Sequence, residues 1–255
     1  MTEAELRDKA LLYWRAHRRL FEARVGRAKR AIIEALEKCP PHRAYVAWSG
    51  GKDSTALAHL VHSIAPEVEM VSQVDDLDFP DKLPYMERVA KQFSFKWRVL
   101  RPEFSVLEYM RKHGIGIERI CAQTHQLTKD AFLKLFERYR AENGKDMVFL
   151  GLRAEESPHR RRNRACRGLL YQHKDGLWVA TPIADWRVWD VFAYHVINDI
   201  PIRPLYLKGD PEKVRSGWVV PPEGAAAHGG VQWLRQHYPE VYAKLAREFP
   251  ELRRF

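Results

Sequence analysis

The sequence has 255 residues, of which 45% are hydrophobic and 30% charged, enough for one sizeable α/β domain with a small appendage. Its formal net charge of +10 predicts an anionic partner, such as a nucleotide, a nucleic acid or a sulfate-like group. The three cysteines include no Cys-x-x-Cys pair, which argues against a four-cysteine iron–sulfur cluster, a zinc site and a disulfide framework. The highly charged N-terminus argues against a signal peptide, and the lack of a long apolar run argues against a membrane span. We therefore expect a cytoplasmic protein.

Residues 1–40 are predicted to form a basic helical extension. Apolar residues recur at spacings of three and four throughout Glu3–Lys38, and the opposite face is rich in Arg and Lys. The pattern fits one long helix or a helical pair broken near Gly26, and Cys39-Pro40-Pro41 ends it. A solvated face, a dimer contact and a nucleic-acid contact all stay open for the basic side.

Strand and helix patterns alternate over residues 41–207. Strands are expected at Arg43–Trp48, Val68–Val74, Phe95–Leu100, Met147–Leu152 and Trp178–Thr181. Helices are expected at Ser54–Ile64, Lys82–Phe93, Ser105–His113, Gln126–Arg140 and Val188–Asp199, and, beyond residue 207, near Tyr238–Phe249. This alternation predicts an α/β fold, with a parallel twisted sheet and helices on both of its faces. Residues 208–255 are predicted to be a C-terminal tail packed on or near the active site.

One loop, in the segment AWSGGKDSTALAHL, carries the strongest chemical signal. The tandem glycines Gly50 and Gly51 permit positive φ angles and close approach of a ligand, so that successive amides form an anion nest. The following helix N-terminus adds unpaired amides, and Lys52 adds a full positive charge. Because ligands of open parallel sheets bind at the carboxyl ends of the strands, Ser49–Thr55 is predicted to bind phosphate.

The loop departs from two other phosphate-binding motifs. The Walker pattern requires glycine where Val46 stands and Ser or Thr where Asp53 stands, and GxGxxG is missing as well. The six residues SGGKDS do match the SGGxDS loop, and in this respect the segment resembles the ATP pyrophosphatase superfamily. A glycine turn that is capped by Asp or Ser is the purely structural alternative.

Three further blocks resemble the phosphoadenosine phosphosulfate reductase family. They are GLRAEES at Gly151–Ser157, TPIADWRVWDVFAYHVINDIPIRPLY at Thr181–Tyr206, and VDDLDFPD at Val74–Asp81. The resemblance covers most of the chain, roughly Tyr45 to Tyr206. It implies an adenine nucleotide α-hydrolase-like, Rossmann-like sheet with the nucleotide across its C-terminal edge.

The resemblance also implies roles for individual residues. The phosphates would be held by Ser49, Gly50, Gly51, Lys52, Asp53, Ser54 and Thr55, the adenosine would be flanked by Ala47, Trp48 and the backbone after Val74, and Asp75, Gly151 and Arg153 would complete the pocket. Lys52, Asp53 and Arg153 are the predicted catalytic residues. Asp75 or Asp76 is predicted to position Mg²⁺, since hard oxygen ligands suit that ion, and a strand-end turn is the alternative.

The activity that the resemblance implies is attack on the α-phosphorus of ATP. An acceptor takes AMP, and pyrophosphate leaves while Lys52, Arg153, the loop amides and Mg²⁺ neutralise its charge. DNA phosphorothioation systems contain a member of this branch. The resemblance therefore implies DNA or RNA as one possible class of acceptor and a small anion as the other. A sulfur donor or a modification-complex protein is the partner that it implies. The family's reductases use a cysteine near the C-terminus, and no cysteine follows Cys166 here. A thiol-dependent reductase is therefore the second hypothesis, and a non-catalytic nucleotide- or nucleic-acid-binding subunit is the third.

Five arginines crowd into His159–Gly168. Four of them, Arg160, Arg161, Arg162 and Arg164, are predicted to bind an anion or the substrate from a mobile loop, because arginine binds phosphate in a bidentate manner. A solvated charged loop is the alternative.

Two cysteine positions stay undecided. Cys166 is either nucleophilic or incidental, and Cys121 forms either a catalytic pair with His125 or a packing contact.

The other notable residues are predicted to be structural. Cys39 ends the first helix, and His59 and His62 are pocket-side or surface residues. Trp186 and Trp189 belong to the core, and Asp185 caps the last helix of the sheet domain.

Overall fold

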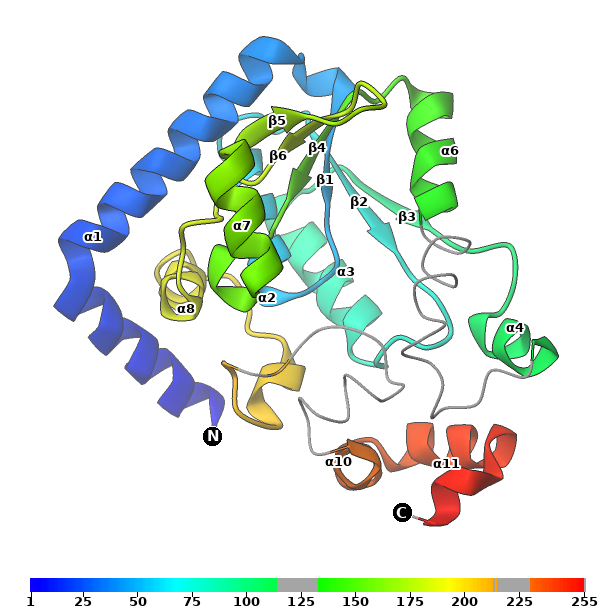
Figure 1. Ribbon diagram of the computed structural model, residues 1–255. Coiled ribbons are helices and arrows are strands. Elements are labelled where there is room, and N and C mark those ends of the chain that lie inside the picture. The colour runs from blue at the N-terminus through cyan, green and yellow to red at the C-terminus, as the bar shows by residue number, and fades with distance from the viewer. Residues whose placement is uncertain (114–132, 213, 215–229, 255) are drawn as a thin grey trace.

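A six-stranded sheet organises the chain, and the computed structural model describes residues 1–113, 133–212, 214 and 230–254 (Figure 1). The strand order is β3-β2-β1-β4-β6-β5, in which β5 runs antiparallel to β6 and the other neighbours are parallel. The strands are β1 (Ala44–Ala47), β2 (Glu69–Gln73), β3 (Trp97–Leu100), β4 (Met147–Leu150), β5 (Leu170–Gln172) and β6 (Trp178–Ala180).

Helices cover both faces of this sheet, as the alternating pattern predicts. They are α1 (Glu3–Lys38), α2 (Lys52–His62), α3 (Lys82–Phe93), α4 (Val106–Lys112), α6 (Lys134–Asn143), α7 (Pro158–Arg167), α8 (Val188–Ile197), α10 (Gly230–His237) and α11 (Pro239–Glu248). Short 3₁₀ turns lie at η1 (Pro41–Arg43), η4 (Ala154–Glu156), η5 (Pro204–Leu207) and η6 (Pro250–Arg254).

The two faces of the sheet are buried by different helices. Successive side chains of a strand point to opposite faces, so Val46 of β1 joins the larger core under α1, α2, α3 and α8. Its neighbour Tyr45 packs instead on Tyr139 of α6, with the ring centroids 5.5 Å apart. The carboxyl edge of the sheet therefore lies between the two layers of helices.

The helix α1 is held to the sheet domain by a buried carboxylate. Asp190 of α8 accepts hydrogen bonds from Arg24 at 2.7 Å and from the Tyr13 hydroxyl at 3.1 Å, and its side chain is 1% exposed. A buried charge needs such partners, because removing them leaves its desolvation uncompensated. The bend in this long helix lies at His17, where φ and ψ leave the helical region, and not near Gly26.

The structure corrects several predicted elements. The arginine-rich segment is the helix α7 and not a loop, and the sixth strand, β5, was not predicted. The third strand begins at Trp97 and the helix after the glycine loop begins at Lys52. The first part of the predicted helix Gln126–Arg140 lies outside the described residues, and α6 forms its end.

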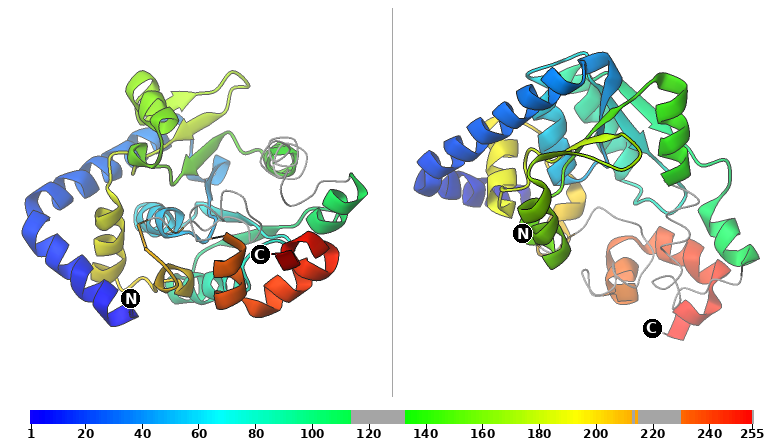
Figure 2. Two further views of the ribbon diagram at one scale, coloured as in Figure 1. Left: turned by 60° about the horizontal axis from the view of Figure 1, so that its bottom comes forward. Right: turned by 45° about the horizontal axis from the view of Figure 1, so that its top comes forward.

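The C-terminal helices α10 and α11 lie beyond the carboxyl edge of the sheet (Figures 1 and 2). Leu234 and Leu245 pack in one apolar cluster with Leu77 and Phe79, which follow β2. In the part of the chain that the structure describes, none of the helices has both the length and the apolar character that crossing a membrane requires.

The end of β4 packs directly on the first turn of α2. A Cβ atom at Gly151 would lie 2.8 Å from both the Cα and the backbone nitrogen of Ser54. We expect Gly151→Ala to lower the free energy of unfolding by about 1–3 kcal/mol, because backbone atoms must shift to admit the methyl group. Urea unfolding measures this change.

Gly26→Ala provides the matched control inside α1. The nearest atom to a Cβ there is Arg30 Nη1 at 3.6 Å, so the extra methyl group is accommodated and the helix gains up to about 1 kcal/mol. Equal effects of the two substitutions would contradict the close packing at Gly151.

Candidate active site

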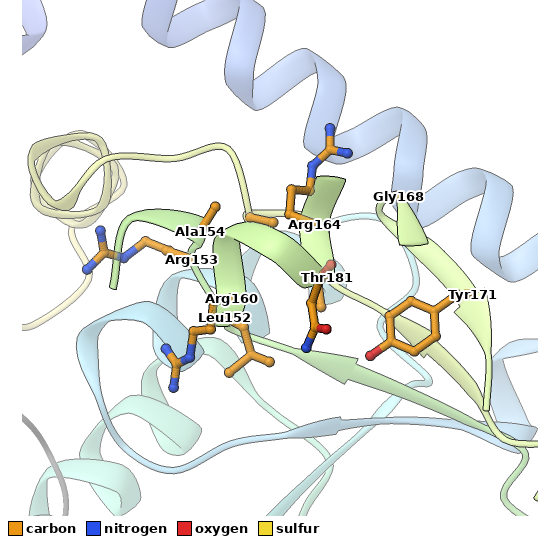
Figure 3. A pocket seen from close by; sticks show the side chains of 10 residues that line it. Leu152, Arg153, Ala154, Arg160, Arg164, Gly168, Tyr171 and Thr181 are labelled. Atoms are coloured by element: carbon orange, nitrogen blue, oxygen red, sulfur yellow. The ribbon is translucent and has the colours of Figure 1, made fainter. Parts of the chain in front are cut away.

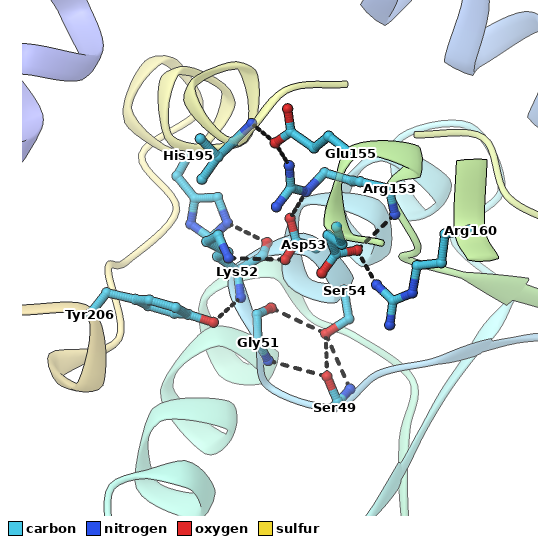
Figure 4. A network of polar contacts seen from close by, with 12 residues as sticks. Ser49, Gly51, Lys52, Asp53, Ser54, Arg153, Glu155, Arg160, His195 and Tyr206 are labelled. Carbon is cyan, nitrogen blue, oxygen red and sulfur yellow. Dashed lines mark hydrogen bonds and ion pairs between the residues drawn. The ribbon is translucent and has the colours of Figure 1, made fainter. Parts of the chain in front are cut away.

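The loop predicted to bind phosphate lies at the carboxyl edge of the sheet, between β1 and α2 (Figure 4). Gly50 has a φ of +69°, and a Cβ atom there would lie 2.7 Å from the sulfur of Met86, so glycine is required. The hydroxyls of Ser49 and Ser54 lie 2.9 Å apart, and Ser54 Oγ donates to the carbonyl oxygen of Gly51 at 3.1 Å. These contacts close the loop into one turn over the helix N-terminus.

Two cations flank one carboxylate at the start of α2. Asp53 Oδ2 lies 3.2 Å from Lys52 Nζ, and Asp53 Oδ1 accepts a hydrogen bond from Arg153 Nε. Burial alone would raise the pKa of Asp53, but the charges of Lys52 and Arg153 outweigh it and hold the pKa below its usual value. The three residues predicted to be catalytic therefore lie together, and Arg153 is 2% exposed.

The backbone of Lys52 is fixed by two residues to which the sequence analysis assigned no role. Its N–H donates to the Tyr206 hydroxyl at 2.8 Å, and its carbonyl oxygen lies 2.8 Å from His195 Nε2 (Figure 4). Burial lowers the pKa of His195, so that the neutral ring donates this hydrogen bond. Both residues lie in the block Thr181–Tyr206, which was the signal that could have found them.

A buried arginine supports the loop from below. Arg203 Nε donates to Asp81 Oδ2 at 2.6 Å, and Arg203 Nη1 lies 3.5 Å from the carbonyl oxygen of Gly50. The other oxygen of Asp81 accepts from the Tyr238 hydroxyl at 2.8 Å. The predicted tail thus supplies a side chain to the framework behind the loop.

The acidic turn after β2 is largely occupied by hydrogen bonds of its own. Asp75 accepts from the Leu77 amide at 2.9 Å, and burial, reinforced by Asp78, raises the pKa of Asp75 to about 6. Asp76 accepts from the Val106 amide at 2.9 Å and so caps the start of α4.

Lys82 places a cation in this same turn, since its Nζ lies 2.8 Å from both oxygens of Asp78. Among the described residues, no three His, Cys, Asp or Glu side chains converge as metal ligands. The pair Asp75 and Asp76 therefore does not fit a metal site built by the protein alone, and a role for either residue toward Mg²⁺ stays a prediction. Such a role would require oxygen ligands from nucleotide phosphates as well.

The residues predicted to flank adenosine lie at the same edge. Trp48 is 1% exposed, and its indole N–H donates to the buried Thr55 hydroxyl at 2.9 Å. The Val74 amide donates to the Leu100 carbonyl oxygen at 3.0 Å. The side chains of Trp48 and Thr55 are therefore core groups, and a ligand beside Ala47 would meet backbone there.

A pocket opens next to Arg153, beneath α7 (Figure 3). Arginine, amide, hydroxyl and aromatic groups mix in its wall, which consists of Leu152, Arg153, Ala154, Arg160, Asn163, Arg164, Gly168, Tyr171, Thr181 and Ala184. Its arginines already have carboxylate partners, because Arg160 pairs with Glu156 and Arg164 with Asp185. The pocket suits a ligand that carries both an anionic group and a flat or apolar part.

The predicted arginine cluster divides between this pocket and solvent. Arg160 and Arg164 line the pocket, whereas Arg161 and Arg162 are exposed on the outer side of α7.

The prediction that Asp185 caps α8 is wrong. Its carboxylate accepts hydrogen bonds from Arg164 and Arg27 instead. The first turn of α8 is capped by Asp190, which accepts from the amide of Arg187.

The remaining candidates lie outside the loop and the pocket. Cys166 is exposed on α7, Cys39 is buried at the far end of α1, and Cys121 and His125 lie outside the described residues. His59 contacts the Tyr194 hydroxyl, His62 packs on Phe95, Trp186 is a core residue and Trp189 packs against the second apolar cluster.

Comparison with known proteins places the chain in one family. Residues 43–250 match the profile of the phosphoadenosine phosphosulfate reductase domain. A phosphoadenosine 5′-phosphosulfate reductase of Xylella fastidiosa is 25% identical over 182 residues, which are 71% of this chain and 74% of that protein. The uncharacterized protein MJ0973 of Methanocaldococcus jannaschii is 28% identical over 204 residues, 77% of this chain but only 45% of that protein.

Solved structures share the fold at low identity. A phosphoadenylyl-sulfate reductase of Candida auris, in a phosphate complex, aligns with a TM-score of 0.59 and 18% identity over 75% of this chain and 87% of its own. An FMN adenylyltransferase of Candida glabrata, with FMN and the ATP analogue AMPCPP, aligns with a TM-score of 0.59 and 15% identity over 78% of this chain and 62% of its own. These likenesses establish the α/β fold.

His59, on α2 behind the loop, makes the stability of the protein depend on pH. Burial is the main cause that lowers its pKa from 6.5 to about 4, so the unfolded chain binds the proton more readily than the folded chain. The contribution of His59 to stability is complete above about pH 6.5 and is lost as the pH falls toward 4, by up to about 3 kcal/mol. Urea unfolding of His59→Gln should show a correspondingly shallower decline over this range.

The same substitution at the exposed His42 controls for the loss of a histidine as such. Parallel stability curves for wild type and His59→Gln between pH 6.5 and 4 would refute the assignment.

Proposed function

Because this chain belongs to the phosphoadenosine phosphosulfate reductase domain family, we propose that it binds ATP at Ser49–Thr55 and transfers AMP to an acceptor. The observation that carries the proposal is the buried pairing of Lys52 and Arg153 on Asp53, at a helix N-terminus beside a glycine loop. An FMN adenylyltransferase with the same fold binds an ATP analogue, which supports this class of ligand.

The chemistry requires in-line attack on the α-phosphorus. An acceptor oxygen forms the new P–O bond, the bond to the bridging oxygen breaks, and pyrophosphate leaves with that electron pair. The proton of the acceptor passes to solvent. Charge grows on the leaving group, and we expect Lys52, Arg153 and the first amides of α2 to stabilise it by turning part of their hydrogen bonding from Asp53 and Tyr206 to the phosphate oxygens.

The pocket beneath α7 is the proposed acceptor site. It adjoins the loop through Arg153, which belongs to the pocket wall and to the Asp53 cluster at once. Arg160 and Asn163 offer donors to an anionic acceptor, and Tyr171 offers an aromatic surface.

A reductase is the second candidate, because the relatives from Xylella fastidiosa carry that name. Such a reaction requires a thiolate that attacks the sulfur of the substrate. Cys166 is exposed on α7 and is not among the residues that line the pocket. The buried Cys39 has a raised pKa because of burial, which disfavours its thiolate. Within the part of the chain that the structure describes, which excludes Cys121, adenylyl transfer therefore has the stronger support.

A product assay tests the proposal. With Mg²⁺ and α-labelled ATP alone, water takes the place of the acceptor, so we expect AMP and an equal amount of pyrophosphate. Lys52→Met should slow their formation by about 100-fold or more, because it removes one cation from the leaving group. Methionine is unbranched and apolar, so it replaces much of the buried lysine stem while removing the ammonium group that lies 5.1 Å from the Tyr206 ring centroid. The exposed Lys91→Met is the matched control and should retain full activity.

Each outcome separates the hypotheses. Formation of ADP in place of AMP contradicts α-phosphorus chemistry. ATP binding without turnover, alone or with nucleic acid and small anions, favours the non-catalytic subunit. Release of sulfite from phosphoadenylyl sulfate in the presence of a thiol favours the reductase, and loss of this activity in Cys166→Ser would identify the nucleophile.

A further inference from the structure

The positive charge of the protein is concentrated in two helical segments. Residues Arg15–Arg30 of α1 and Pro158–Arg167 of α7 together contain twelve Lys and Arg and a single acidic residue, Glu22. The whole chain has 43 basic and 33 acidic residues, so the remaining 229 residues carry 31 and 32 and are almost neutral. The net charge of +10 is therefore a property of these two segments and not of the surface in general.

Most of these basic side chains face solvent. The exposed ones are Arg15, Arg18, Arg19, Arg27, Lys29 and Arg30 on α1, and Arg161, Arg162 and Arg167 on α7. The apolar face of α1 is occupied by the core through Phe21, Ala28 and Ile32, and Leu20 is the large apolar side chain of the basic segment that is exposed. One exposed leucine among six exposed cations does not form the broad apolar face with which a helix inserts into a lipid surface. The exposed surface is thus mainly cationic and is carried on helices.

Asp185 joins the two helices into one surface. Its carboxylate accepts from Arg164 of α7 at 2.8 Å through each oxygen, and Oδ2 also lies 3.3 Å from Arg27 of α1. These hydrogen bonds from Arg164 are the main cause that lowers the pKa of Asp185, so the bridge stays ionised near neutral pH. The two basic segments therefore meet at this bridge, although more than a hundred residues separate Arg27 from Arg164 in the sequence.

We propose that the exposed basic surface of α1 and α7 binds the sugar-phosphate backbone of a nucleic acid. The α1 segment is about 22 Å long at 1.5 Å per residue, which matches about six base-pair steps of a duplex. Side chains that repel one another at this density are stabilised by a polyanion, and counterion release supplies the binding free energy.

The surface also leads to the proposed acceptor pocket. The helix α7 begins at Pro158, directly after η4, and its first turn carries Arg160, which lines the pocket together with Arg153. A nucleic acid on α7 therefore lies beside the loop. The idea that it is the acceptor rests on the proposed function, whereas its binding to the surface does not.

Fluorescence anisotropy with a labelled DNA duplex, and with its single strand, tests the surface in the absence of ATP. We expect binding that weakens by roughly 100-fold between about 50 and 200 mM salt, as about four phosphate contacts predict. The variant Arg19→Gln/Lys29→Gln/Arg30→Gln should weaken binding about tenfold or more and make the salt slope shallower by about 2–3. None of these three side chains takes part in an ion pair among the described residues.

The variant Lys91→Gln/Lys96→Gln/Lys112→Gln removes the same charge from exposed positions elsewhere and should bind as the wild type does. Equal weakening by both triple variants would overturn the assignment to α1 and α7. Binding to anionic phospholipid vesicles, with no binding to either oligonucleotide, would overturn it as well. Because Lys52→Met should still bind DNA, a failure of AMP formation is distinguishable from a failure of this surface.

Discussion

The carboxylate of Asp53 is the group on which the arrangement of the site depends. It lies in the first turn of α2 and holds Lys52 from its own helix and Arg153 from the segment after β4. Removing one partner of a buried ion pair costs about 3–5 kcal/mol, because the other charge is left without compensation. Asp53 therefore joins two neighbouring strand ends electrostatically, while Gly151 lets their backbones approach closely enough for that contact. Neither feature would position the arginine without the other.

The site itself carries almost no excess charge. Its three cations, Lys52, Arg153 and Arg160, are opposed by Asp53, Glu155 and Glu156. An anion at this site would then be attracted mainly by the loop amides and the helix N-terminus, which point in fixed directions. The surplus on α1 and α7 supplies the longer-range field, which draws anions toward this side of the molecule and is weakened by salt. The long-range attraction of anions and their local orientation would thus depend on different parts of the chain.

Much of this architecture follows from local sequence patterns. The strand β1, the glycine loop and α2 were predictable because apolar periodicity and tandem glycines are local signals, and Gly50 shows the positive φ that was expected. The helix α7 was missed because five arginines indicate charge rather than helix periodicity, and β5 because three residues are too few for a pattern. The block Thr181–Tyr206 could have drawn attention to His195 and Tyr206, but their contacts with Lys52 span more than 140 residues, so a local pattern could not assign their role.

The C-terminal helices belong to the framework of the loop for the same reason. Asp81, just before α3, accepts hydrogen bonds from Tyr238 and Arg203, and the Arg203 guanidinium extends to the carbonyl oxygen of Gly50. Arg203 is fully buried, and its Nη2 has no partner among the described residues, so its position depends on Asp81. Any displacement of α10 that breaks the hydrogen bond from Tyr238 leaves Asp81 less firmly fixed. Because Asp81 positions Arg203, the contact between Arg203 and the carbonyl oxygen of Gly50 would weaken as well. Tyr238, which follows the last strand, β6, by 58 positions, therefore helps to determine the shape of the glycine loop.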